Sequence, residues 1–166
     1  MGKEYVTEES FELFEQANAD IVVIGDWLNK KEISEKVRYG RACYHATQAV
    51  EKMLKGYLRH KGEALVEKTH NLNKLLDISK SKDEKFENLL RDCAYLNEYT
   101  SAMRYSTKNE IKREDITEVL TRLKSIYNFE IINSLYNEYD KNKIFKMLPH
   151  NYIDKIIRKS KMGTQG

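Results

Sequence analysis

The residues best suited to acid–base or anion chemistry lie between positions 38 and 59. Arg38 precedes His45 by seven residues and Arg41 precedes it by four, so a helix would place an imidazole and a guanidinium on one face. Such a pair can cleave a phosphodiester, because histidine moves a proton of a ribose hydroxyl and arginine stabilises the phosphate charge. The commoner alternative is a histidine satisfied by its neighbours beside surface arginines.

A polar and largely cationic stripe runs along the same segment. Its members recur at alternating steps of four and three residues, which places them on one side of a helix. They are Arg41, His45, Gln48, Lys52, Lys55 and Arg59. The stripe predicts either an anion-binding surface or a solvated or dimer-facing side whose long stems cover apolar neighbours.

Most catalytic signatures are missing from the sequence. It contains no glycine-rich phosphate loop, no HExxH, no CxxC and no nucleophile elbow. The four histidines, His45, His60, His70 and His150, show no recurring metal-ligand spacing. We therefore expect no metal and no cofactor.

Apolar residues at helical spacing predict the elements that carry these side chains. A first helix begins at a Thr7 cap and ends near 29–31, and a second follows a Ser34 cap. Thr69 is predicted to cap a short helix, and Ser81 with Glu84 matches a capping box that begins a third long helix.

A polar stretch at 101–109 interrupts the pattern before a fourth long helix over 116–131. One proline and seven glycines leave too little turn chemistry for an all-β fold. The predicted class is all-α, an antiparallel four- to five-helix up-and-down bundle with a basic C-terminal extension.

Residues 1–139 are expected to form the bundle and residues 140–166 the extension. From Asp140 onward seven Lys and Arg side chains stand against two acids, a run that is either solvated or in contact with phosphate. Pro149 precedes a predicted turn or helix around 150–160, packed on the bundle or on a partner.

Composition sets the remaining limits. The charges nearly cancel, with 29 Lys and Arg against 26 Asp and Glu, which argues against a dedicated DNA-binding domain. Cys43 and Cys93 fall on apolar helix faces, so we expect buried, reduced thiols. No apolar run approaches the roughly 18 residues that span a bilayer, and the first residues lack an apolar signal core, so we expect a cytoplasmic location and no membrane partner.

The run from Tyr44 to Leu58, Y-H-A-T-Q-A-V-E-K-M-L-K-G-Y-L, resembles the central helix of HEPN (higher eukaryotes and prokaryotes nucleotide-binding) domain proteins, roughly F-H-A-x-Q-A-x-E-K-x-L-K-x-x-L. Two further family-like landmarks follow in order, at 69–72 (T-H-N-L) and 103–105 (M-R-Y), while Ala17 and Asp20 resemble the first helix of the family. The resemblance covers about residues 8–135. Ser106 stands where many relatives have proline.

The resemblance implies a helical bundle that often forms a homodimer and is linked to nucleotide binding, to minimal nucleotidyltransferase partners or, in some branches, to RNA cleavage. Our first hypothesis is a non-catalytic nucleotide- or RNA-binding dimer, the accessory half of a nucleotidyltransferase or toxin–antitoxin-like pair. The residues expected around its phosphate or base are His45, Gln48, Lys52, Lys55, His70, Arg104 and Tyr105.

Two alternatives remain open. A metal-independent ribonuclease would use His45 as general acid and base, with Arg41 or Arg38 stabilising phosphate. The ribonuclease branches resemble one another in an Arg followed four to six residues later by His, late in the bundle, and no such pair follows Arg104. The other alternative is a structural dimerisation module defined by its apolar patches.

Overall fold

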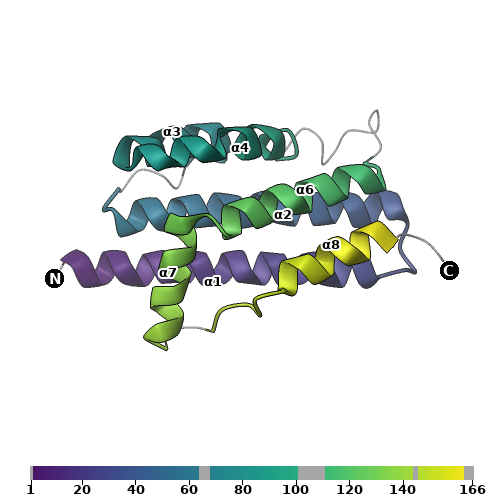
Figure 1. Ribbon diagram of the computed structural model, residues 1–166, viewed down its shortest axis with the longest axis horizontal. Coiled ribbons are helices and arrows are strands. Elements are labelled where there is room, and N and C mark those ends of the chain that lie inside the picture. The colour runs from purple at the N-terminus through teal and green to yellow at the C-terminus, as the bar shows by residue number, and fades with distance from the viewer. Residues whose placement is uncertain (1, 64–67, 101–110, 144–145, 163–166) are drawn as a thin grey trace.

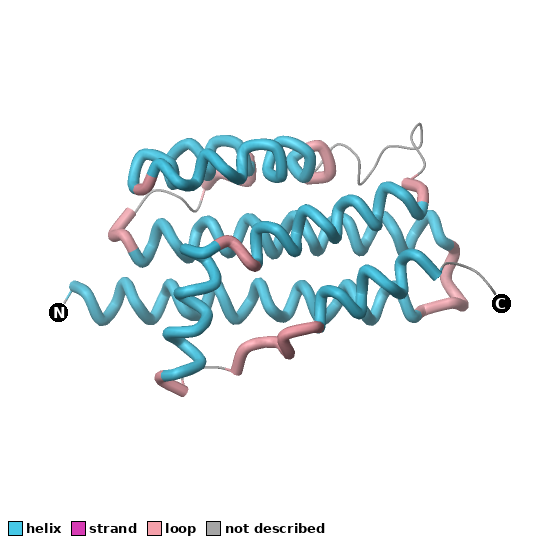
Figure 2. The backbone as a smooth tube through the Cα atoms, in the orientation of Figure 1, coloured by secondary structure: helices cyan, strands magenta, loops and turns pink. Residues whose placement is uncertain are grey.

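The computed structural model describes residues 2–63, 68–100, 111–143 and 146–162, with side chains from residue 8 onward (Figures 1 and 2). All regular elements in these ranges are helical, which confirms the predicted all-α bundle. Arg104, Tyr105 and Ser106 lie outside the described residues.

The centre of the fold is an antiparallel pair of long helices, α1 (Gly2–Asn29) and α2 (Glu35–His60). Their apolar residues at three- and four-residue spacing face each other and are fully buried, among them Phe14, Ile21, Ala46 and Met53. Gly56 is required where they meet, because a Cβ there would lie 2.8 Å from Cε2 of Phe14.

The helix ends differ in part from the predicted caps. Thr7 lies inside α1, so the cap predicted there is wrong. Ser34 does occupy the position before α2, but its hydroxyl makes no capping hydrogen bond. The predicted start is therefore too late, because α1 already begins at Gly2.

The segment after α2 forms α3 (Leu72–Lys82), the 3₁₀ helix η1 (Glu84–Leu89) and α4 (Leu90–Asn97), not one short and one long helix. Asn71, not Thr69, caps α3 by accepting from the N–H groups of Asn73 and Lys74 at 2.9 and 3.2 Å. Ser81 lies in the last turn of α3, and the predicted capping box is wrong.

The predicted fourth long helix is divided. α6 (Arg113–Tyr127) and α7 (Glu130–Lys141) meet at Asn128, and α7 crosses the other helices in Figure 1. The crossing places Tyr136 and Tyr139 against α1, where Tyr136 donates to the carbonyl of Phe14 at 3.1 Å. The buried tyrosine pair provides the packing that favours two helices over one.

The final helix, α8 (Tyr152–Met162), packs on α6 and α1. Ile153, Ile156 and Ile157 are buried there, and the hydroxyls of Ser160 and Thr117 share a 2.9 Å hydrogen bond. The C-terminal ends of α1 and α8 therefore gather with the N-terminal ends of α2 and α6 at one end of the bundle (Figure 1).

Cys43 and Cys93 are free and buried, as predicted. Burial raises the pKa of both thiols, that of Cys93 to about 12, so neither is a thiolate near neutral pH. No helix in the described ranges is long and apolar enough to cross a membrane.

Candidate functional site

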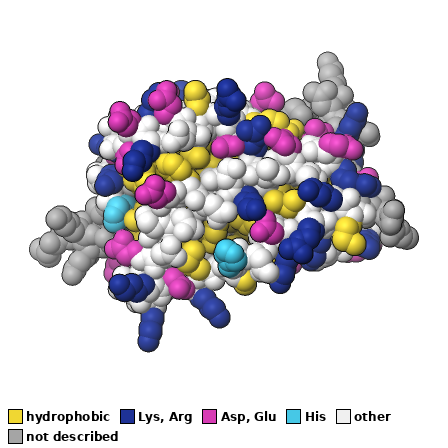
Figure 3. Space-filling model, in the orientation of Figure 1, with side chains coloured by type: hydrophobic (Ala, Val, Ile, Leu, Met, Phe, Trp, Pro, Cys, Tyr) yellow, Lys and Arg dark blue, Asp and Glu magenta, His cyan; other side chains and the backbone are white. Residues whose placement is uncertain are grey.

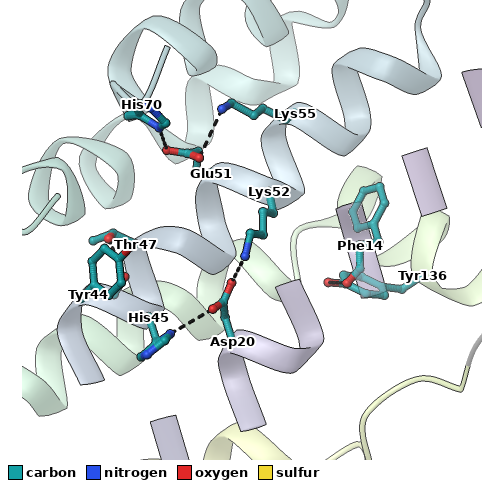
Figure 4. Close-up of polar contacts among 10 residues, drawn as sticks. All are labelled: Phe14, Asp20, Tyr44, His45, Thr47, Glu51, Lys52, Lys55, His70 and Tyr136. Atoms are coloured by element: carbon teal, nitrogen blue, oxygen red, sulfur yellow. Dashed lines mark hydrogen bonds and ion pairs between the residues drawn. The ribbon is translucent and has the colours of Figure 1, made fainter. Parts of the chain in front are cut away.

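Asp20 of α1 joins two members of the cationic stripe on α2 (Figure 4). One carboxylate oxygen lies 3.0 Å from Nδ1 of His45, and the other accepts from Nζ of Lys52 at 2.6 Å. The side chains are 12% exposed for Asp20, 21% for His45 and 24% for Lys52. The charged groups are thus partly desolvated, which makes their interaction stronger than that of a surface ion pair.

Glu51 forms a second centre of the same composition. Its two oxygens lie 3.2 Å from Nζ of Lys55 and 2.9 Å from Nδ1 of His70. Lys55 follows Glu51 by one helical turn, whereas His70 comes from the segment just before α3. Glu51 and Lys55 are buried and His70 is mostly exposed, so this centre reaches from the core to the surface.

Each carboxylate forms a hydrogen bond with Nδ1 of its histidine and does not engage the opposite ring nitrogen, Nε2. Within the described ranges, neither His45 nor His70 makes a hydrogen bond through Nε2. A carboxylate on Nδ1 holds the imidazole in one orientation. The Nε2 atom of an imidazole donates to a phosphate oxygen when it carries a proton and accepts from a base donor when it does not.

The two arginines proposed to assist His45 have other roles. Arg38 is 6% exposed, and its guanidinium donates to the carbonyls of Ile33 at 2.9 Å and Leu28 at 3.2 Å. Arg41 lies over the ring of Trp27, with its guanidinium carbon 6.0 Å from the ring centroid. Arg38 therefore secures the turn between α1 and α2, and the structure does not bring either guanidinium to His45.

The other predicted residues are distributed along α2 and beyond it. Gln48 is half-buried on the stripe, one turn from both His45 and Lys52. Arg59 is engaged by Glu9 at 3.6 Å. The structure therefore brings His45 to Lys52 through Asp20 and Lys55 to His70 through Glu51. Arg104 and Tyr105 lie outside the described residues.

Sequence reasoning did not assign Asp20 and Glu51 to the site. The four-residue spacing of Glu51 and Lys55 was a usable local signal for their ion pair. Asp20 had no such signal, because its partners lie 25 and 32 residues further along the chain. Among the described residues, no three His, Cys, Asp or Glu side chains converge in a way that could hold a metal ion.

Comparison with known proteins identifies the family. The HEPN domain model matches residues 12–135, a span that contains both carboxylate centres. No curated protein and no solved structure matches the chain. The chain belongs to the HEPN domain family, which indicates a function connected with nucleotides or RNA.

Proposed function

We propose that this protein is a non-catalytic nucleotide- or RNA-binding homodimer that serves as the accessory partner of a minimal nucleotidyltransferase or of a toxin–antitoxin-like system. The observation that carries the proposal is the repeated arrangement of one carboxylate with one histidine and one lysine, at Asp20 and at Glu51. Both arrangements lie within the HEPN span.

The arrangement favours binding because its donors are fixed before a ligand arrives. Lys52 and His45 are held by Asp20, so little side-chain entropy is lost when Nε2 of His45 donates to a phosphate. Gln48 adds an amide on the same stripe, able to donate to and accept from a base edge. Non-catalytic function is favoured because Arg38 and Arg41 are engaged away from His45.

Thermal unfolding of the full chain with ATP, GTP or a short RNA tests this proposal. A ligand at a hundredfold excess over its dissociation constant adds about 2.7 kcal/mol to the free energy of unfolding, which corresponds to a rise of roughly 5–10 °C in the melting temperature. We expect this ligand-induced rise to be smaller in Lys52→Ala and His70→Ala than in the parent protein. Each variant is compared with and without ligand, so that its intrinsic stability cancels.

Lys74→Ala is the matched control, because Lys74 is exposed on α3 and lies in no ion pair among the described residues. Its ligand-induced rise should equal that of the parent protein. An equal rise in all four proteins would place binding elsewhere. No rise with any ligand would favour the other alternative, a structural dimerisation module. Sedimentation of the Lys52→Ala variant with its partner protein would then test that alternative.

A second candidate function is favoured by the Asp20–His45 contact alone. A carboxylate on Nδ1 with the opposite nitrogen available is the arrangement that general acid–base histidines use. In this hypothesis the chain is a metal-independent ribonuclease with Lys52, not arginine, beside the scissile phosphate. Incubation with end-labelled RNA discriminates: cleavage abolished by His45→Ala but retained in His70→Ala would establish the ribonuclease, and intact RNA would exclude it.

A further inference from the structure

A cavity of about 440 Å³ opens at the end of the bundle where α1, α2, α6 and α8 meet. Its charged lining residues are all cations and come from the loop after α1 and from three helices: Lys31, Arg38, Arg113, Lys159 and Lys161. Among the described residues, no Asp or Glu lines it. Lys and Arg side chains are also prominent at this end of the molecule in Figure 3.

The cations of the cavity lack the carboxylate partners that most stripe cations have. Across residues 8–63, 68–100, 111–143 and 146–162, none of the five lies in an ion pair. Nε of Arg113 is buried and has no hydrogen-bond partner in these ranges. A buried donor without a partner is rare in proteins, and a bound anion is one kind of acceptor that satisfies such a donor.

The position of the two lysines on α8 is fixed by the residue between them. Ser160 is buried, donates to the carbonyl of Ile157 at 2.6 Å and shares a hydrogen bond with Thr117 of α6. Thr117 lies one turn after Arg113, so Lys159 and Lys161 are held beside the same end of α6. The cavity therefore forms only when α8 packs on the bundle. The α8 helix lies beyond the residues that match the HEPN domain model.

We propose that this cavity binds a polyphosphate group, either the triphosphate of a nucleotide or an inorganic polyphosphate. Its volume falls within the ~300–1,000 Å³ typical of small-molecule sites, which is too large for one phosphate to contact cations on every wall. A chain of phosphates carries several charges and can contact cations on more than one wall of the cavity at the same time. Leu28 and Met162 add apolar lining that would suit a nucleotide base.

This site is separate from the carboxylate centres on α2, so each proposal can fail without the other. The cavity is tested by titration calorimetry of the full chain with inorganic tripolyphosphate, ATP, orthophosphate and a short RNA without a 5′ phosphate. We expect tripolyphosphate and ATP to bind, and orthophosphate to bind far more weakly. Tighter binding of ATP than of tripolyphosphate identifies the nucleotide as the source of the group, and equal binding identifies inorganic polyphosphate.

The decisive variants are matched pairs on α8. Lys159→Ala with Lys161→Ala removes two charges from the cavity, whereas Lys155→Ala with Arg158→Ala removes two exposed charges of the same helix that do not line it. Because charge-assisted hydrogen bonds to phosphate are strong, we expect the first pair to weaken tripolyphosphate binding about tenfold or more, and the second less than about twofold. Arg113→Gln should weaken it comparably.

Three results would overturn the proposal: no binding of tripolyphosphate by the parent protein, equal weakening in the two double variants, or binding of RNA alone. Circular dichroism of each variant establishes that it is folded. The α8 pair keeps the test decisive should Arg113→Gln fail to fold. The Lys52→Ala variant should bind tripolyphosphate with unchanged affinity.

Discussion

The middle of the α1–α2 pair and the cavity at the end of the bundle balance their positive charges in different ways. Around Asp20 and Glu51, a nitrogen of each of two lysines and two histidines lies within about hydrogen-bonding distance of a carboxylate oxygen. Around the cavity, five cations share no carboxylate in the described part of the chain. The carboxylates of the first region lie against its cations, whereas no carboxylate of the described residues neutralises the charge that the second region gathers.

The contrast indicates which cations contribute to folding. A buried carboxylate with two cationic partners is strongly coupled to its site, because removing it leaves partly desolvated cations without that carboxylate. Exposed lysines at a helix end stay hydrated, so removing them changes stability little. Mutations around Asp20 and Glu51 should therefore lower stability more than mutations at the cavity do.

The largest expected effect is the loss of a carboxylate. Glu51→Ala should lower the free energy of unfolding by about 3 kcal/mol and Asp20→Ala by about 2 kcal/mol, since each removes the carboxylate that a lysine and a histidine contact and Glu51 is the more buried. Urea unfolding followed by circular dichroism measures both. In the double variant Asp20→Ala/Lys52→Met part of the stability should return, and strict additivity would contradict the coupling.

A much smaller effect is expected at the cavity. Lys159→Ala with Lys161→Ala relieves repulsion among like charges but removes cations from the last turn of α8, where the helix dipole favours them. The two effects oppose each other, so the free energy of unfolding should change by less than about 0.5 kcal/mol. A loss comparable to that of Asp20→Ala, measured by the same urea titration, would mean that these lysines are structural and would remove the contrast.

The smallest effect concerns His60, in the last turn of α2. Unlike His45 and His70 it makes no ion pair with a carboxylate among the described residues, although the charge of Glu138 opposes part of the effect of burial, and its Nδ1 is buried without a hydrogen bond. Burial lowers its pKa below the ordinary 6.5, so the neutral form is favoured in the folded state. The stability that depends on neutral His60 is therefore fully present above pH 6.5 and decreases as the pH falls below that value.

His60→Gln should accordingly lose less stability than the parent protein between pH 7.5 and pH 5.5. Chemical unfolding at the two pH values gives the two differences directly. Other groups titrate equally in both proteins and cancel in the comparison. Equal differences would show that His60 does not contribute to the pH dependence.

The local spacing of apolar residues was enough to predict the long helices and their buried faces. The apolar faces of α1 and α2 repeat every three to four residues, so their existence, their buried side and the burial of Cys43 follow from the sequence. The breaks between η1 and α4 and between α6 and α7 were not predictable, because η1 and α7 are set by what they pack against. A helical pattern continues across Asn128, but the burial of Tyr136 requires a change of direction there.

Helical periodicity and the family-like motif were sufficient to predict an all-helical HEPN bundle and a helix that presents His45, Gln48, Lys52 and Lys55 on one side. The helix packing was needed to show that Asp20 pairs with His45 and Lys52, that Arg38 secures a turn, and that Arg113 lines a cavity with Lys159 and Lys161. The physical reason is distance along the chain. Side-chain spacing fixes which residues share a helix face, whereas the partner of that face is chosen by the packing of helices that are far apart in sequence.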